Sequence, residues 1–387
     1  MTNDALRPIL NQLKHFAAIS DQEGVFPEME FKLLRNAGLL HMFLEKHPLR
    51  FRPGQTAGLL DTLKMIGSAS LPAGRIFEGH VNALQLIDLF ASQAQKDFYF
   101  SQVFESQSLF GVWNTQDRDG VKIKELGNGQ YQLEGSKNFC SGAGAVACPI
   151  ITGELLQKGT ENRESGWKSG WKPGWKPGWQ MCVVPAEKMK AVRTDGTLWR
   201  PLGMRASVSY KMDFSGIVLD QTDLIGPPDA YYRQPYFSAG AVRFAAVQLG
   251  AAQAVQEETH QFLRENDRAD DPFQKARTAE IACLVETGNL WIKRAAAMTD
   301  TWKWSPEQND KLVAYMNLTR TVMNEICLKT LALSERSVGL RALMQPHPLE
   351  MIHRDLTTYL KQPGPDAALT SAGNYILEQQ TVSSLWQ

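Results

Sequence analysis

The spacing of apolar side chains changes twice along the chain and divides it into three parts. In the first part apolar residues recur every three to four positions, which predicts amphipathic helices over residues 6–16, 27–40, 56–66, 79–89 and 93–104. Short β-rich runs between Gly, Asp and Asn turns then predict strands over residues 109–113, 131–133, 149–152, 180–184 and 212–219. The helical spacing returns over residues 239–263, 272–303, 305–334 and 348–361.

This α–β–α order predicts an α+β fold that is mostly α. A chain of 387 residues is too long for one simple core, so we expect separate domains. We place an N-terminal helical domain at residues 1–108, a middle β-barrel or β-sandwich domain at 109–228, and a C-terminal four-helix bundle at 229–387.

One stretch of the middle part combines a strand pattern with two residues of chemical interest. Residues 131–135 alternate apolar and polar positions, as in a half-buried strand, and Gly135-Ser136 indicates a tight turn. In the next strand Phe139 and Ser141 would share one face, and an aromatic plane beside a hydroxyl suits a flat ring such as a flavin. The same residues also fit an ordinary hairpin with a core Phe.

The composition narrows the classes of function. The 41 basic and 41 acidic residues cancel, which argues against binding to a nucleic-acid backbone. No apolar run approaches membrane-spanning length, and the N-terminus lacks the basic-then-apolar pattern of a secretion signal. Five scattered cysteines without a Cys-x-x-Cys pair predict reduced thiols in a cytoplasmic protein. The histidines lack companions at metal-ligand spacing, so we expect no metal site.

A short Gly-Trp-Lys repeat occupies residues 166–180, between two predicted strands. Its Gly and Pro residues are incompatible with a helix. Such a segment fits a tandem expansion tolerated in a surface loop. It also fits a docking element, because exposed Trp beside Lys suits contacts with a partner.

Two spaced motifs in the middle part match a known pattern. The first is Gly-x-Lys-x-Phe-x-Ser, at Gly135, Lys137, Phe139 and Ser141. The second is Gly-x-Arg-x-Ser-x-Ser, at Gly203, Arg205, Ser207 and Ser209. With Phe in place of Trp and Ser in place of Thr, the two motifs resemble those of the middle β-domain of the acyl-CoA dehydrogenase family. Looser similarity at residues 27–40 and 348–355 extends the resemblance over most of the chain.

The resemblance implies an FAD-dependent oxidoreductase that forms a homodimer or homotetramer through the C-terminal bundle. It implies cofactor-binding roles for Trp113, Asn114, Thr115, Phe139, Ser141, Arg205 and Ser207. Phe139 would stack on the flavin ring and Ser141 would hydrogen-bond it, while Ser207 would lie near the FAD phosphates. The Arg-x-x-Phe-Gly element with which the family grips the FAD pyrophosphate is replaced by Asp-Asp-Pro-Phe-Gln at residues 270–274.

The catalytic residue that the family uses is missing. The resemblance implies α,β-desaturation of an acyl thioester, in which a Glu removes the α-proton, the flavin accepts a hydride and an electron-transfer protein takes the electrons. The position for this Glu, nine residues after Arg354, is Pro363, and the alternative position near Gly240 also lacks a carboxylate. Asp366 and His80 remain as candidate bases, although helix-end charges and core histidines are the commoner roles of such residues.

Two other hypotheses remain open. Flavin-dependent monooxygenases similar to dibenzothiophene monooxygenase share this fold and need no Glu, although they tend to carry a His where this chain has Gln362. A non-catalytic dimer with the Gly-Trp-Lys loop as its contact is the third hypothesis. The sequence predicts a small-molecule substrate, which an acyl thioester would satisfy, and leaves its identity open.

Overall fold

The computed structural model describes residues 6–156, 178–383 and 385–386, and it is an α+β fold with helices in the majority. The helices that precede the sheets are α1 (Leu10–Glu23), α2 (Glu28–Asn36), α3 (Thr56–Ala69), α4 (Leu71–Phe90) and α5 (Gln93–Ser106). A short helix, α6 (Ala186–Met189), lies between strands. The later helices are α7 (Tyr236–Ala239), α8 (Ala241–Glu265), α9 (Pro272–Thr301), α10 (Pro306–Val338), α11 (Pro348–Tyr359) and α12 (Pro365–Leu377).

The middle part forms two sheets. The seven-stranded sheet contains β3 (Phe110–Trp113), β4 (Lys122–Gly127), β5 (Gln130–Glu134), β7 (Cys148–Leu156), β8 (Trp179–Val183), β11 (Val218–Asp220) and β12 (Leu224–Ile225). The three-stranded sheet contains β6 (Ser136–Cys140), β10 (Tyr210–Asp213) and β9 (Arg193–Asp195). A separate hairpin joins β1 (Leu44–Lys46) to β2 (Leu49–Phe51). Whether the three parts of the chain act as separate domains stays a prediction.

The chain crosses between the two sheets twice at the same place, which corrects two predictions. Strands β5 and β6 are consecutive but do not pair, so the expected hairpin after Gly135 is absent from these residues. The single strand predicted over residues 212–219 is wrong, because β10 pairs with β6 and β11 pairs with β5. Gly135 N–H donates to Ser215 Oγ (3.0 Å) and Phe214 N–H donates to Gly135 O (2.9 Å), which ties the two crossings together.

Close helix packing joins the N-terminal part of the chain to the C-terminal part. Gly250 of α8 lies against α3, where an added Cβ would stand 2.0 Å from Lys64 O. Gly67 of α3 approaches α8 in the same way, since its Cβ would be 2.3 Å from Val247 O. Residues without side chains at both positions therefore let the two helix backbones approach each other.

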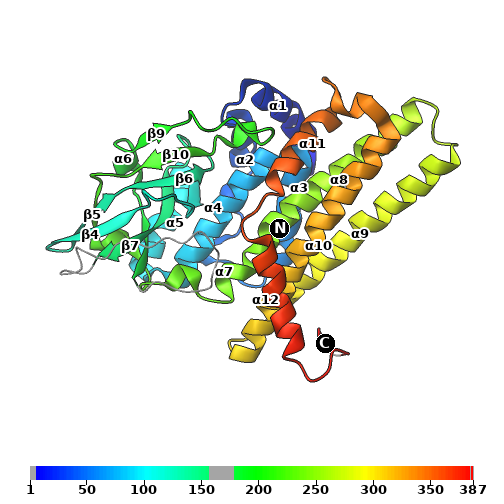
Figure 1. Cartoon of the computed structure of the whole chain (residues 1–387). Coiled ribbons are helices and arrows are strands. Elements are labelled where there is room, and N and C mark those ends of the chain that lie inside the picture. Colours follow the sequence, from blue (N-terminus) through cyan, green and yellow to red (C-terminus); the bar gives the residue numbers. More distant parts are fainter. Residues whose placement is uncertain (1–5, 157–177, 384, 387) are drawn as a thin grey trace.

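Helix α4 connects the sheets to the bundle. Figure 1 shows the strands gathered at one end of the molecule, the long helices α8, α9 and α10 side by side at the other, and α4 between them. Its Ser70 N-cap accepts from Ala73 N–H, and its apolar side chains are buried on most of its circumference. Helix α4 therefore contacts both the strand β3 and the helix α8.

Two further expectations can be compared with the structure. All five cysteines are unpaired, and only Cys283 is exposed. Over the described ranges, none of the helices is both long enough and apolar enough to span a bilayer.

Candidate functional site

Two strand ends and a loop meet where the sequence predicts the cofactor. Trp113 at the end of β3 donates its indole N–H to Ser141 O just beyond β6 (3.0 Å). Gly142 N–H donates to Ser207 O in the short 3₁₀ turn η4 (Arg205–Ser207) (2.8 Å). The structure thus brings together most of the predicted cofactor-binding residues, namely Trp113, Asn114, Thr115, Phe139, Ser141 and Ser207.

Phe139 has the features of a residue placed for a ligand. Its φ angle is 54°, an uncommon backbone conformation for an aromatic residue. Its side chain is 60% exposed. Among the described residues, the one aromatic ring that it contacts is Trp199, which it meets edge-on (6.3 Å between centroids, 69° between planes). A strained backbone that holds a large apolar ring in solvent is typical of a binding site rather than of a core.

A chain of three hydroxyl groups lies beside Phe139. Ser141 Oγ and Ser207 Oγ each lie 2.8 Å from Ser209 Oγ. Three hydroxyl groups carry three protons, and two hydrogen bonds among them use two. One hydroxyl group of this hydroxyl chain therefore keeps a proton with which it can donate a hydrogen bond to a ligand. Ser209, the middle member, belongs to the second sequence motif but is not among the predicted cofactor-binding residues.

Asn114 is oriented by its neighbours. Its Oδ1 accepts hydrogen bonds from Tyr232 Oη (3.2 Å) and from Thr152 Oγ1. With both lone pairs engaged, its side chain can offer only the amide N–H groups to a ligand. Trp113, in contrast, is 2% exposed and supports Ser141 from behind, whereas Thr115 is exposed.

Lys137 is a buried cation in the first motif to which the sequence analysis assigned no function. Its Nζ donates to Asn114 O (3.1 Å), Gln116 Oε1 (2.5 Å) and Thr152 Oγ1 (3.3 Å). It also lies 5.5 Å from the Trp179 ring. Burial lowers the pKa of Lys137 to about 7. Lys137 therefore holds the backbone of the site at Asn114, through the hydrogen bond to its carbonyl oxygen.

Trp179 belongs to the end of the Gly-Trp-Lys repeat loop. It stands edge-on to Tyr232 (6.2 Å between centroids), next to the site. Residues 166–177 of the repeat lie outside the described residues, so the docking hypothesis stays a prediction.

Arg205 does not join the predicted cofactor residues through its side chain. Its guanidinium group donates to Asp21 of α1 through Nε (3.1 Å) and Nη2 (2.7 Å). Arg354 of α11 donates to the same carboxylate (2.8 Å) and to Glu350 (2.5 Å from Nε). Burial alone would raise the pKa of Asp21, but hydrogen bonds from Arg354 and Arg205 lower it below its ordinary value. Arg205 thus joins elements rather than reaching a ligand.

Neither candidate base has the surroundings of a catalytic group. His80 is fully buried, accepts from Phe110 N–H at Nδ1 (3.1 Å) and lies 2.8 Å from Leu40 O through Nε2. Burial lowers the pKa of His80 to about 4, so the ring is neutral and both nitrogens are occupied. Asp366 is exposed in the first turn of α12, where a carboxylate stabilises the helix end.

The position of the family Glu offers no base either. Pro363 lies in the connection between α11 and α12, and its carbonyl accepts from Arg320 Nη2 (2.9 Å). The adjacent Gln362 donates its amide to Tyr359 O (2.7 Å). Within the described parts of the chain, no three His, Cys, Asp or Glu residues gather as metal ligands.

A partly open pocket of about 220 Å³ lies on the bundle side of α4. Apolar side chains from α3, α4, α7 and α8 form most of its wall, among them Leu60, Leu86, Tyr236 and Val242. Arg243 and Gln85 also line it, and Arg243 Nη1 donates to Gln85 Oε1 (2.7 Å). No local sequence pattern predicts this pocket, because its wall comes from helices far apart in the chain.

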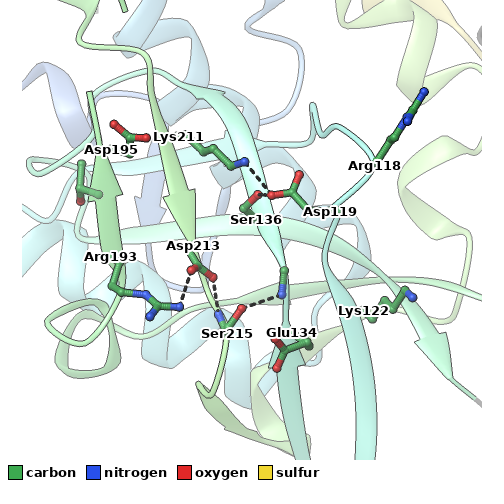
Figure 2. A pocket seen from close by; sticks show the side chains of 13 residues that line it. Arg118, Asp119, Lys122, Glu134, Ser136, Arg193, Asp195, Lys211, Asp213 and Ser215 are labelled. Carbon is green, nitrogen blue, oxygen red and sulfur yellow. Dashed lines mark hydrogen bonds and ion pairs between the residues drawn. The ribbon is translucent and has the colours of Figure 1, made fainter. Parts of the chain in front are cut away.

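A larger pocket of about 540 Å³ lies on the β-domain and is a polar surface depression (Figure 2). Its charged side chains are Arg118, Lys122, Arg193, Lys211, Asp119, Glu134, Asp195 and Asp213. Figure 2 shows Lys211 paired with Asp119 (2.6 Å) and Arg193 paired with Asp213 (2.5 Å). Its four basic and four acidic groups balance, and of the described residues lining it none is a predicted cofactor ligand.

The N-terminus of α9 is the place where the family resemblance would put the pyrophosphate grip. Asp271 caps this helix and accepts from Phe273 N–H (2.8 Å) and Gln274 N–H (2.9 Å). Asp270 precedes it and pairs with Lys275 (3.1 Å). The carboxylates of Asp270 and Asp271 at this helix end disfavour the binding of a further anionic group there.

The chain is similar in sequence to one protein family and to several known proteins. Residues 242–361 match the family described as Acyl-CoA dehydrogenase, C-terminal domain. The dibenzothiophene monooxygenase of Rhodococcus erythropolis is 19% identical, over 97% of this chain and 92% of its own. The putative acyl-CoA dehydrogenase YdbM of Bacillus subtilis is 20% identical, over 93% of this chain and 92% of its own.

The solved structures that resemble the chain include flavin complexes. FMN-bound TdsC from Paenibacillus sp. A11-2 aligns with a TM-score of 0.85 at 20% identity, with 99% of each chain covered. A structure of TdsC with FMN and indole aligns with a TM-score of 0.83 at 20% identity, with 100% of each chain covered. Both of these TdsC structures contain FMN. The match of residues 242–361 to this family and the likeness of the whole chain to the solved structures show that the chain has an acyl-CoA dehydrogenase-like fold.

Proposed function

We propose that this protein is a flavin-dependent monooxygenase that uses FMN and acts on a small organic molecule. The observation that carries the proposal is a contrast between two groups of residues. The aromatic and hydroxyl groups suited to a flavin ring are assembled at Phe139 and Ser141, whereas Pro363 and Gln362 stand where a desaturase needs its carboxylate. Similarity to dibenzothiophene monooxygenase and to FMN-bound TdsC supports the oxygen chemistry over desaturation.

A bound, reduced flavin supplies the two electrons that split dioxygen, so that one oxygen atom enters the substrate and the other leaves as water. The residues of this chain supply the surroundings for that chemistry. Phe139 offers an exposed apolar face for the flat ring, and its strained backbone fixes where the ring must lie. The hydroxyl chain ending at Ser141 holds a proton that can be donated to an acceptor at the ring edge.

Asn114 completes this arrangement from the other strand. Since Tyr232 and Thr152 occupy its carbonyl oxygen, its amide group donates towards the ligand side. Trp113 and Lys137 act as positioning residues, because they hold the Ser141 and Asn114 backbone carbonyls rather than the ligand.

The choice of FMN over FAD follows from the charge at α9. A pyrophosphate needs donors or cations, and Asp270 and Asp271 occupy the place where the family grips it. FMN has no pyrophosphate and avoids this repulsion. Assembly as a homodimer or homotetramer, as the resemblance implies, remains part of the proposal.

The test is flavin uptake and oxygen reactivity in the purified protein. We expect FMN to bind at least roughly tenfold more tightly than FAD, and Phe139→Ala and Ser141→Ala each to weaken FMN roughly tenfold, equal to about 1.4 kcal/mol. Phe98→Ala and Ser101→Ala, in the exposed part of α5, are matched controls and should bind FMN like wild type.

The second half of the test separates the two reactions. Oxidised, flavin-loaded protein mixed anaerobically with acyl-CoA thioesters should keep its flavin absorbance. Reduced, flavin-loaded protein mixed with oxygen should be reoxidised and should transfer oxygen to an aromatic acceptor such as indole. Bleaching by an acyl-CoA, or full FMN affinity in both site variants, would refute the proposal.

A further inference from the structure

We infer that a buried cluster of Arg75, Glu78 and Arg243, together with Tyr231 and Tyr359, binds an anionic oxygen group of the ligand, such as a carboxylate. The identification of this ligand as the substrate rests on the proposed function, whereas the anion site itself does not. The cluster joins the first turns of α4, the start of α8, the turn η6 (Ala230–Tyr232) and the end of α11.

The charges of the cluster do not balance. Arg75 Nη1 lies 2.5 Å from Glu78 Oε2, and Arg243 Nε lies 3.1 Å from Glu78 Oε1. Two guanidinium groups therefore share one carboxylate, which leaves one positive charge in excess. The Glu78 and Arg243 side chains are only 5% and 13% exposed. An excess of positive charge with little access to water is costly, so an anion in this place would stabilise the cluster.

Arg75 retains the capacity to bind a ligand. A guanidinium group carries five N–H donors, and in the described part of the chain Arg75 uses only Nη1 in a hydrogen bond to protein. Its side chain remains 29% exposed, although protein groups surround and desolvate it. The planar donors that remain match the two oxygens of a carboxylate.

Tyr359 gives an independent indication of a ligand. Its side chain is only 4% exposed, and its hydroxyl group has no hydrogen-bond partner among the described residues. Helix α11, which ends at Tyr359, packs against helix α4, which carries Arg75 and Glu78. Buried hydroxyl groups in native proteins are almost always satisfied, and an anion held by Arg75 would accept this unused proton.

The cluster adjoins the proposed flavin site. The charges of Glu78, Arg243 and Arg75 influence the pKa of the buried Tyr231, and the next residue, Tyr232, donates to Asn114 (3.2 Å). The residue after Arg75, Ile76, packs against Gly142 beside the hydroxyl chain, since a Cβ on Gly142 would lie 3.3 Å from Ile76 Cγ2. The cluster and the ring-binding residues are therefore connected through neighbouring positions of α4 and η6.

The apolar pocket of about 220 Å³ continues from the same cluster. Arg243 and Gln85 line it, and Glu78, Asn82, Gln85 and Leu89 follow Arg75 at helical spacing along α4. This face of α4 is thus charged at Arg75 and Glu78 and carries amides at Asn82 and Gln85, and the apolar part of the pocket wall comes largely from the neighbouring helices. This combination suits a small molecule with an anionic group and an apolar body, rather than a wholly apolar aromatic.

Benzoate and nitrobenzene test this inference, because they have nearly the same shape and differ in charge. We expect FMN-loaded protein to bind benzoate at least roughly tenfold more tightly than nitrobenzene, as measured by equilibrium dialysis, since charge-assisted hydrogen bonds have about this strength. Arg75→Gln should weaken benzoate roughly tenfold or more and nitrobenzene less than about threefold. Arg118→Gln, in the polar surface pocket, is the matched control and should change neither.

Tyr359→Phe covers the case in which Arg75→Gln does not fold. This variant removes a hydroxyl group without breaking a hydrogen bond to protein, so its stability should equal or exceed that of wild type. Benzoate should bind it roughly threefold to tenfold more weakly, with nitrobenzene unchanged. Equal affinity of wild type for the two probes, or equal losses of both in the variants, would overturn the anion site.

The same titration of flavin-free protein separates this inference from the proposed function. Charge-dependent benzoate binding in a protein that takes up no FMN would refute the proposed function and support the anion site. FMN uptake without charge-dependent benzoate binding would refute the anion site alone.

Discussion

His80 illustrates how burial decides the role of a single residue. A histidine near the predicted substrate region is a reasonable candidate for acid–base chemistry, because its ordinary pKa lies close to neutrality. In the structure its two ring nitrogens connect α4 to Phe110 of β3 and to Leu40, and no part of the ring is exposed. His80 is therefore a structural residue, which holds α4 against the strand that carries Trp113 and Asn114.

The stability of the protein should depend on pH through His80. Its pKa is about 4 in the folded protein and about 6.5 when unfolded, so between these values only the unfolded state takes up a proton. The stabilisation is complete above pH 6.5 and is lost as the pH falls to about 4, by roughly 3 kcal/mol in total.

Chemical denaturation of wild type and His80→Gln from pH 8 to 4 measures this loss. Gln keeps one donor and one acceptor but does not titrate. The stability difference between the two proteins should be constant above pH 7 and should shrink by roughly 3 kcal/mol by pH 4. A difference that is constant over the whole range would show that His80 is not held neutral.

At the scale of elements, glycine sets how closely helices α3 and α8 can approach. Gly250→Ala would place a Cβ 2.0 Å from Lys64 O, which is a backbone atom and cannot rotate away. We expect a loss of about 3 kcal/mol in the free energy of unfolding, because the two helices must separate. Gly373→Ala is the matched control in α12, where a Cβ would meet no atom within 4 Å. It should stabilise the protein by about 0.5–1 kcal/mol through helix propensity. Equal effects of both substitutions in urea denaturation would contradict this account.

The elements also show what the sequence could and could not predict. Apolar spacing is a local property, so the long helix predicted over residues 272–303 is confirmed as α9. Strand pairing is not local, and residues 212–219 give the same alternation whether they form one strand or, as here, two strands in different sheets. Helix α12 lies beyond the last predicted helix, although a Pro in the first turn, as at Pro365, is a favoured start of a helix.

The candidate site was predictable to the extent that its residues are close in sequence. Phe139 and Ser141 belong to one short motif, and the structure places them beside each other and next to Ser207. Arg75, Arg243 and Tyr359 lie in three helices separated by more than a hundred positions each. No local pattern connects them, so their cluster could be recognised only after the helices were packed together.

At the scale of the whole molecule, one carboxylate joins the three parts of the chain. Asp21 lies in α1, and it accepts hydrogen bonds from Arg205 in the middle part and from Arg354 in the last part. Gly203 contributes to the same junction, because it lies against the Arg354 backbone with no room for a side chain. The second family motif, which the resemblance assigned to the cofactor, therefore also connects the β-domain to helices at both ends of the sequence.

Asp21→Asn should weaken this junction. The substitution keeps the shape of the side chain and removes the charge that two guanidinium groups share, which leaves Arg205 without its carboxylate. We expect a loss of about 2–3 kcal/mol in the free energy of unfolding, below the usual cost of breaking a buried pair, because Arg205 is 36% exposed and Glu350 still pairs with Arg354. Glu45→Gln is the matched control, since the exposed pair of Glu45 with Arg50 (2.6 Å) should contribute less than about 1 kcal/mol. Urea denaturation followed by both tryptophan fluorescence and far-UV circular dichroism measures the two losses. If Asp21→Asn costs no more than Glu45→Gln, the three parts of the chain are held together by their apolar contacts alone.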